Sequence, residues 1–308
     1  MGRGNQTIQF TREIKMKISK TLTFMLAILP LGSAEASPWL IGVNPSLTQG
    51  SYSGSVLRDT LTDRGIRVTA NYLDEGGITA GYSRTRVGMK TSPSISQDNW
   101  LLSGHLNHYL DSGNGKLTFR LDGYRLNNND FAGGTGGVTT YAPQISWLSS
   151  DSMKYSDLGF AYSSYPNQLT VKQYTPTAGF GFDRGSDWIQ LRAYLIRGLN
   201  PARAEGKSST TGMDAKWTHY FSPGSLIMPT FASLGIFLGE KIYAVDMDAM
   251  SVANLADLQR GGETVSLGWK MARNVKLFAL LGQSRYRNAL IANDYKLNVG
   301  YLDLSVDW

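Results

Sequence analysis

Apolar and polar residues alternate at every second position along most of the chain after residue 36, and this period of two restricts the fold more than any other feature. The clearest stretches are 116–122, 189–195, 213–218 and 265–271. In the first of them, Leu117, Phe119 and Leu121 alternate with polar residues. Successive side chains of a β-strand point to opposite faces, so each stretch predicts a strand with one apolar and one polar face. This alternation fits a soluble β-sandwich and a membrane-spanning β-barrel equally well.

The connections between the predicted strands alternate between short turns and longer loops. The short ones are rich in Gly, Asp, Asn and Ser and fall at 74–77, 111–115, 149–152, 183–186, 222–225 and 272–274. The longer ones fall at 51–64, 91–98, 126–137, about 164–168, 198–211, 246–262 and 288–294. Short turns at one end and longer loops at the other are typical of bacterial outer-membrane barrels.

Six turns and seven loops separate fourteen strands, and an even number places both ends of the chain at the short-turn end. The first strand, near 39–47, has the weakest pattern. The connection at 164–168 is short for the loop end, which leaves twelve strands as the alternative.

The first 36 residues have the order of regions that is typical of a secretory signal. Lysines precede a ten-residue apolar run at 22–31, and Ala34 and Ala36 follow in an A-x-A pattern. Ten apolar residues are too few to span a bilayer as a helix. We therefore interpret this region as an upstream extension and a cleaved signal peptide, with the mature protein starting at Ser37.

The remaining chain, 37–308, contains no linker and is predicted to form one domain. Removing five basic and two acidic residues with the first 36 lowers the formal net charge from +6 to +3, which gives no indication of nucleic-acid binding. The chain has 34 Gly, 16 Tyr and no Cys, as in β-rich exported proteins. The best candidate for a transmembrane helix, the uncharged stretch 226–239, covers only fourteen residues and includes Pro229 and two Gly, so no such helix is expected.

The chain ends on a strand-like pattern with an aromatic residue in the last position. Leu302, Leu304 and Val306 occupy alternate positions before Trp308. A strand that continues to the last residue needs a partner strand to hold it, and a closed barrel provides one.

Together with the signal and the alternating strands, this ending resembles Gram-negative outer-membrane β-barrels, whose last strand is recognised by the barrel-assembly machinery. In that family a Gly often stands five residues before the end, where this chain has Asp303. The resemblance implies an antiparallel up-and-down barrel, integral to the outer membrane, in contact with lipid. The layout is also loosely similar to YaiO-type outer-membrane proteins, small barrels often associated with exopolysaccharide systems.

If the apolar faces contact lipid, the charged residues between them point into the barrel lumen. The predicted pore-lining bases are Lys116, Arg120, Arg192, Lys216, Lys270 and Lys276, and the predicted acids are Asp122, Asp157, Asp214 and Asp303. This is a mild excess of bases. Charged side chains in a lumen either line a selective pore or pair and close it. Fourteen strands enclose more space than the eight-stranded barrels that side chains fill, so we expect some water-filled passage.

Candidates for chemistry are few. His105 and His108 lie three residues apart on a predicted strand and point to opposite faces, so they cannot share a metal. Ser103 and His105 share a face, which leaves a lipid hydrolase as a distant alternative without a recognisable third group. Acids of the 246–262 loop could hold a cation or, as the preferred interpretation, solubilise a short amphipathic segment; they are Asp246, Asp248 and Asp257.

The functional prediction is a porin-like passive channel for small hydrophilic solutes, with no enzymatic activity, no metal and no cofactor. The first alternative is a non-conducting structural barrel or a partner in exopolysaccharide export. The expected partners are outer-membrane lipid and the barrel-assembly machinery. The sequence does not identify the solute.

Overall fold

The structure is a computed structural model that describes residues 37–130, 135–166, 168–198, 200, 202, 204–222, 224 and 228–308. The predicted signal peptide, with the cleavage residues Ala34 and Ala36, lies outside the described residues. None of the helices within the described part of the chain is long and apolar enough to cross a membrane.

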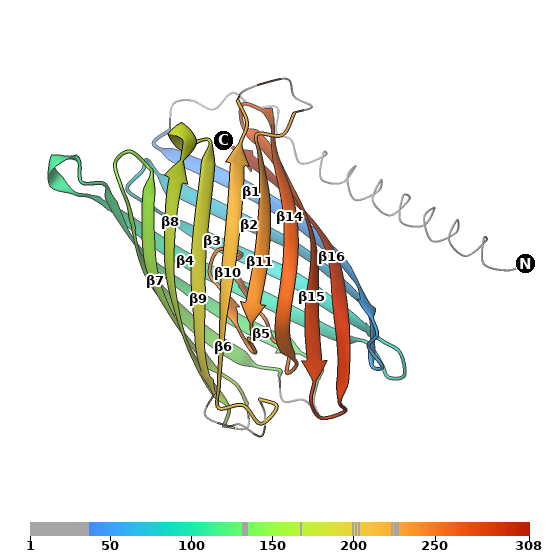
Figure 1. The fold of residues 1–308 in the computed structure, drawn as a ribbon. Coiled ribbons are helices and arrows are strands. Elements are labelled where there is room, and N and C mark those ends of the chain that lie inside the picture. The colour runs from blue at the N-terminus through green and yellow to red at the C-terminus, as the bar shows by residue number, and fades with distance from the viewer. Residues whose placement is uncertain are drawn as a thin grey trace, which may run out of the picture. The chain divides into compact units, whose positions relative to one another are not determined.

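Fourteen antiparallel strands form one closed barrel (Figure 1). They are β1 (Trp39–Ser53), β2 (Arg58–Tyr72), β3 (Gly76–Met89), β4 (Ile95–Tyr109), β5 (Lys116–Asn128), β6 (Val138–Leu148), β7 (Lys154–Ser164), β8 (Thr170–Phe182), β9 (Asp187–Gly198), β10 (Ser209–Tyr220), β11 (Phe231–Gly239), β14 (Leu258–Ala272), β15 (Val275–Asn288) and β16 (Asn293–Asp307). Each strand pairs with its neighbours in the chain, and β16 closes the barrel by pairing with β1. The predicted all-β class, the up-and-down topology and the count of fourteen are confirmed.

Three short elements lie outside the barrel wall. Two 3-10 turns, η1 (Asp111–Gly113) and η2 (Asp183–Gly185), occupy connections at the short-turn end. The other element is a two-stranded hairpin of β12 (Val245–Asp246) and β13 (Ser251–Val252), within the connection from β11 to β14.

Turn-forming residues end the strands at the short-turn end. Gly115 has a φ of +107°, and a Cβ there would lie 2.1 Å from the carbonyl oxygen of Leu148. Asp183 and Arg184 also adopt positive φ, of 46° and 56°. These conformations allow each strand to reverse within a few residues.

Several strands extend further than the sequence pattern indicates. The predicted loop at 51–64 was wrong in extent, because β1 and β2 leave only 54–57 between them. Polar residues such as Thr60 and Thr62 interrupt the alternation of apolar and polar residues, so the sequence gives no strand pattern here. The pairing of β2 with β1 nevertheless continues as far as Ser51, which lies opposite Thr60. The predicted loop at 246–262 instead spans 240–257, and the turn predicted at 222–225 spans 221–230.

The terminal strand has the partner that the sequence analysis expects. Leu302 lies opposite Leu47 of β1, and Val306 lies opposite Val43. The backbone N–H of Trp308 donates to the carbonyl of Ile41 at 2.8 Å, and the reverse bond measures 2.9 Å.

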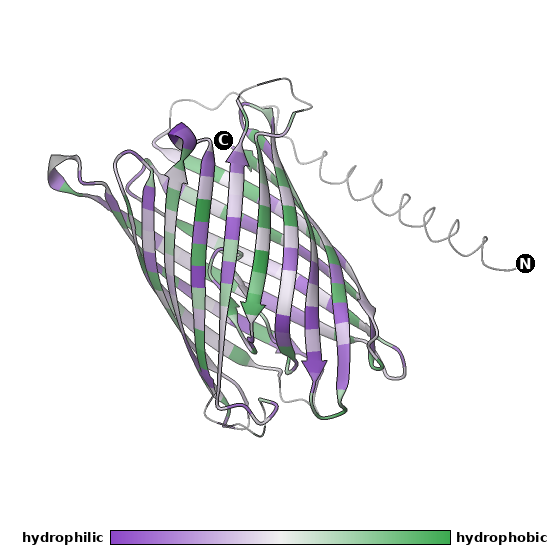
Figure 2. Cartoon of the chain, viewed as in Figure 1, coloured by the Kyte–Doolittle hydropathy of each residue, from purple (hydrophilic) through white to green (hydrophobic). Residues whose placement is uncertain are grey.

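Apolar side chains point outward from the barrel wall. Leu106 of β4 is 68% exposed and Leu121 of β5 is 55% exposed, whereas Asp122, the next residue, is 1% exposed. Figure 2 shows hydrophobic and hydrophilic residues alternating along the strands. So much exposed apolar surface would be unfavourable in water and is the surface that a lipid bilayer accommodates. The architecture is that of a membrane-spanning β-barrel.

Candidate functional site

The connection from β11 to β14, residues 240–257, folds into the barrel; we call it the lumen loop. Its hydrogen-bonding partners come from strands on widely separated parts of the wall. Gln173 of β8 and Arg192 of β9 contact its first half, and Gln97 of β4 and Arg58 of β2 contact its second half. Because these strands lie around a closed barrel, the loop crosses the lumen.

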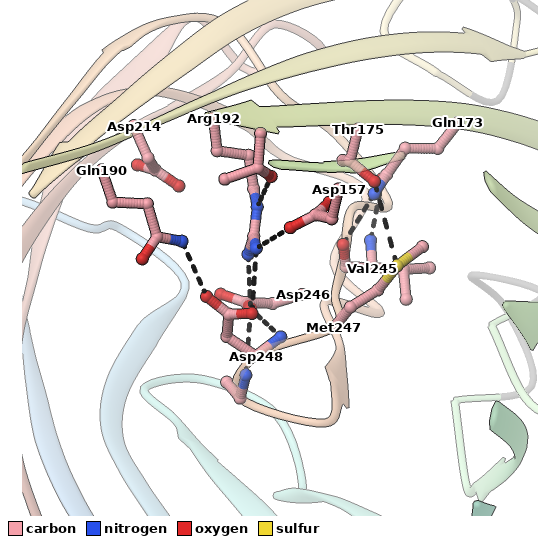
Figure 3. A network of polar contacts seen from close by, with 12 residues as sticks. Asp157, Gln173, Thr175, Gln190, Arg192, Asp214, Val245, Asp246, Met247 and Asp248 are labelled. Carbon is pink, nitrogen blue, oxygen red and sulfur yellow. Dashed lines mark hydrogen bonds and ion pairs between the residues drawn. The ribbon is translucent and has the colours of Figure 1, made fainter. Parts of the chain in front are cut away.

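Gln173 holds the backbone of the lumen loop against β8. Its amide Nε2 donates to the carbonyl of Val245 at 2.6 Å, and the Val245 N–H donates to Oε1 at 2.9 Å. Gln173 is only 1% exposed. Nearby, the Thr175 hydroxyl lies 3.9 Å from Met247 Sδ (Figure 3). One buried amide thus satisfies both backbone groups of Val245, as a neighbouring strand would.

Arg192 joins the wall to the lumen loop through three carboxylates (Figure 3). Its Nη2 lies 2.9 Å from Asp248 Oδ1 and 3.5 Å from Asp157 Oδ2, and its Nη1 lies 3.9 Å from Asp246 Oδ1. Its Nε donates to Thr177 Oγ1 at 2.9 Å. One guanidinium therefore faces three acids, and this point of the lumen carries excess negative charge.

The ionisation of Asp248 is set by two opposing effects. Its partial removal from water alone would raise the pKa of its carboxyl group. The attraction and hydrogen bond of Arg192, with smaller effects from Lys216 and Gln190, outweigh this effect, so the pKa of Asp248 lies below its ordinary value. The carboxylate that ties the loop to Arg192 is therefore charged at neutral pH.

Apolar side chains cover the other side of the lumen loop. Ile242, Tyr243, Val245 and Met247 are at most 5% exposed and pack in a cluster with Val171, Tyr194 and other wall residues. Each such side chain contributes about 1.5–3 kcal/mol when fully buried. This burial fixes the first half of the loop against β6–β9.

A second anchor holds the end of the lumen loop. Asp257, which is 3% exposed, forms an ion pair with Arg58 and accepts hydrogen bonds from Tyr295 at 2.5 Å and Asn288 at 3.0 Å. Asn254 donates to Gln97 Oε1 at 2.6 Å. The loop is thus tied to the wall near both of its ends.

A cavity of about 990 Å³, which we call the lumen cavity, lies beside the lumen loop. It borders loop residues 241, 246 and 248–256 and strands β1–β5, β9–β11 and β14–β16. No described residue of β6, β7 or β8 lines it, because the loop covers that part of the wall. Its charged lining residues are Arg58, Asp63, Arg67, Asp130, Arg192, Asp214, Lys216, Lys241, Asp246, Asp248, Glu263 and Asp303.

Four of the predicted pore-lining residues border this cavity: Arg192, Asp214, Lys216 and Asp303. Asp214 lies 3.7 Å from Lys241, whose ammonium group also lies 4.3 Å from the ring centre of Phe237. Their contribution to conduction stays a prediction.

The other predicted residues lie apart from the cavity. Arg120 forms two hydrogen bonds, of 2.8 and 2.6 Å, with the carboxylate of Asp122. Asp157 is buried under Arg192. The three predicted lysines lie at the short-turn end. Lys116 lies 3.4 Å from Asp74, and Lys276 lies 3.4 Å from Asp307. Lys270 lies opposite Lys276 in the pairing of β14 with β15.

Sequence reasoning missed the residues that shape the cavity from the lumen loop and from β2. Asp246 and Asp248, expected to solubilise a short amphipathic segment, contact Arg192 of the wall. Among the described residues, no group of three acid, His or Cys residues is arranged to suit a metal. Arg67 contacts Asp303 at 2.8 Å. Its inward direction could have been predicted from the sequence, because it lies between Ile66 and Val68, which face outward. Seven acids and five bases line the cavity, whereas the pore-lining residues expected from the sequence include more bases than acids.

The geometry does not form the hydrolase pair considered from the sequence. The hydroxyl of Ser103 donates to Asp122 Oδ1 at 2.6 Å, and the described contacts include no hydrogen bond between Ser103 and His105. A Ser nucleophile needs a base that accepts its proton. Asp122 already accepts bonds from Arg120 and Tyr124 as well, so it braces the wall.

No family model and no curated protein sequence matches the chain. Similar solved structures include the translocator domain of autotransporter NalP from Neisseria meningitidis, 13% identical with a TM-score of 0.43 over 98% of this chain and 97% of that chain. The outer membrane protein Omp33 of Acinetobacter baumannii is 9% identical, with a TM-score of 0.46 over 87% and 99%. OprD of Pseudomonas aeruginosa is 9% identical, with a TM-score of 0.41 over 88% and 94%.

Likeness at this level carries no argument about function. The similarity to YaiO-type proteins is not confirmed. The lumen loop and the cavity beside it are the features of this barrel that bear on its function.

Proposed function

We propose that the protein is an integral outer-membrane protein of a Gram-negative bacterium and a passive channel. The proposed passage is the lumen cavity, and the lumen loop is its constriction. One observation carries the proposal: the loop crosses the barrel and still leaves about 990 Å³ beside it. The apolar outer surface supports the membrane location. Strand β16 is the proposed element that the barrel-assembly machinery recognises.

Cations are the proposed preferred ions. Two more acids than bases line the cavity, and acidic rings favour cations in channels. Arg192 offsets this charge only in part, because three carboxylates surround it.

Single-channel recording of the protein purified from membranes tests this function. We expect discrete current steps in KCl and a reversal potential, in a salt gradient, that indicates preference for K⁺ over Cl⁻. Folded barrels that give no current steps would contradict the channel, and a preference for Cl⁻ would contradict the charge argument.

The chain has no Cys, so a single introduced thiol reports on its own surroundings. Lys216→Cys places a thiol in the cavity lining, and Leu281→Cys places one on the outer surface, where Leu281 is 70% exposed. A cationic thiol reagent should lower the current of the Lys216 variant and leave that of the Leu281 variant unchanged. Equal effects on the two variants would oppose the assignment of the passage.

A non-conducting structural barrel is the second candidate. The observation that favours it is the attachment of the lumen loop near both ends, through Arg192 and Arg58. Intact folding without any current would support this candidate. A role in exopolysaccharide export stays a prediction that the fold does not test.

A further inference from the structure

We propose that the lumen cavity binds small organic cations that carry an apolar body, such as quaternary or protonated amines with an alkyl or aromatic group. The inference names the solute class of the proposed channel and rests on that function for transport. Binding itself requires only the cavity.

Apolar side chains face the cavity from two sides. On the wall, Leu61, Val87 and Val299 are half-buried beside the buried residues Tyr52 and Leu297. On the lumen loop, Met250, Val252 and Leu255 are half-buried and line the same cavity. A passage specialised for hydrophilic solutes would place polar groups at these positions, whereas an apolar solute body gains contact with both sides.

Asp63 provides a charge without a counter-charge in the same cavity. Its Oδ1 accepts hydrogen bonds from Ser83 at 3.1 Å and Thr85 at 2.6 Å. No Lys or Arg among the described residues lies within ion-pair distance of it, whereas Asp303 is paired with Arg67 at 2.8 Å. Its hydroxyl partners orient the carboxylate but leave its charge uncompensated.

Asp63 and the apolar wall are neighbours. Leu61 precedes Asp63 by two residues on β2, so both side chains point into the lumen. Neutral hydrogen-bonding groups complete this surface, since Asn99 donates to Ser83 and Thr85 at 3.0 and 3.1 Å. An ammonium group at Asp63 would place an attached alkyl or aryl group against Leu61.

Two other solute classes fit less well. Anions would meet seven acids against five bases. Sugars usually stack on free aromatic faces, whereas in this lining Tyr286 already stacks on Tyr295 at 5.4 Å and the ring of Tyr301 packs against Phe278 at 6.0 Å. A cation with an apolar body matches both the unpaired carboxylate and the apolar walls.

The test uses benzyltrimethylammonium, with benzenesulfonate as a probe of similar shape and opposite charge. Two readouts are taken on the purified barrel: block of single-channel K⁺ current, and calorimetric binding in detergent. We expect the cation to block and to bind, and the anion to do neither. Asp63→Asn should weaken binding roughly tenfold, which corresponds to about 1.4 kcal/mol. Asp74→Asn, at an exposed aspartate outside the cavity, is the matched control and should bind as the unmodified protein does.

A second variant separates the apolar contribution from the charge. Leu61→Ser should weaken binding of benzyltrimethylammonium but leave the weaker binding of tetramethylammonium unchanged. A similar loss for both probes would mean that the apolar wall is not part of the site.

The outcomes distinguish this inference from the proposed function. K⁺ current without binding or block would overturn the solute class and leave the channel intact. Binding that depends on Asp63 in a barrel that carries no current would support the ligand class and contradict the channel. Absence of both binding and current would overturn both.

Discussion

Replacing Arg192 by Gln should change both the stability and the ion preference of the barrel, whereas replacing Arg120 by Gln should change stability alone. Both guanidiniums pair with a buried carboxylate: the side chain of Asp157 is 0% exposed and that of Asp122 is 1% exposed. Only Arg192 lines the lumen cavity. The two variants therefore form a matched pair.

The loss of stability follows from the acids left behind. Removing one partner of a buried ion pair costs about 3–5 kcal/mol. We expect Arg120→Gln to fall at the low end, because Ser103 and Tyr124 still donate to Asp122. The loop carboxylates on Arg192 are 39% and 47% exposed, so each adds at most about 1 kcal/mol.

The change in ion preference follows from Coulomb's law. A unit charge about 10 Å from an ion in water changes the energy of that ion by about 0.4 kcal/mol. This energy changes the local concentration of each ion by a factor of about two. Arg192→Gln should thus raise the K⁺ to Cl⁻ permeability ratio roughly fourfold, since the two ions respond in opposite directions. Urea unfolding in detergent and reversal potentials in a KCl gradient measure the two effects. An unchanged ratio in Arg192→Gln, or an equal change in Arg120→Gln, would refute the placement of the passage.

Three further outcomes are expected. Gln173→Ala, which removes both bonds to Val245, should make the lumen loop more sensitive to protease while the barrel remains folded; equal cleavage of both proteins would contradict the clamp. The pKa of Asp248 is lowered in the folded state. Its contribution to loop attachment is therefore complete above the ordinary aspartate pKa of about 3.9 and is lost as the pH falls through the lower folded value. Current fluctuations should thus increase only in strongly acidic buffer. Current that does not change in acid would argue against this attachment. Trp308→Ala should reduce the yield of folded barrel far more than Leu290→Ala, a change at an 82% exposed residue between β15 and β16. Membrane levels of heat-modifiable protein measure this yield, and equal yields would remove Trp308 from the assembly signal.

The barrel wall could be predicted because its signal is local. Leu117, Phe119 and Leu121 show a period of two that needs no distant partner, and Trp308 ends a strand that must pair. The fourteen strands followed from these patterns and from the rhythm of turns and loops. The predicted strand bounds were wrong where both faces are polar, as in the extension of β1 and β2, and also around β11 and at the start of β14.

The lumen loop could not be predicted because its contacts join distant parts of the chain. Gln173 and Val245 are 72 residues apart, and Arg58 and Asp257 are 199 residues apart. In the sequence, Gln173 looks like any other inward-facing polar residue. A weak signal exists in residues 242–247, which are mostly apolar although they belong to a loop. Such residues avoid water, and here they do so inside the barrel.

The most direct test of the account is the conductance of a barrel without the lumen loop. Lys241 and Gln259 lie opposite one another and exchange backbone hydrogen bonds of 3.0 and 2.9 Å, so an Asn-Gly turn in place of residues 242–258 can close the hairpin. If the loop is the constriction, the shortened protein should fold as a barrel and show single-channel conductance several-fold above that of the full chain. A folded, shortened barrel with unchanged conductance would contradict the central claim that the lumen loop limits the passage.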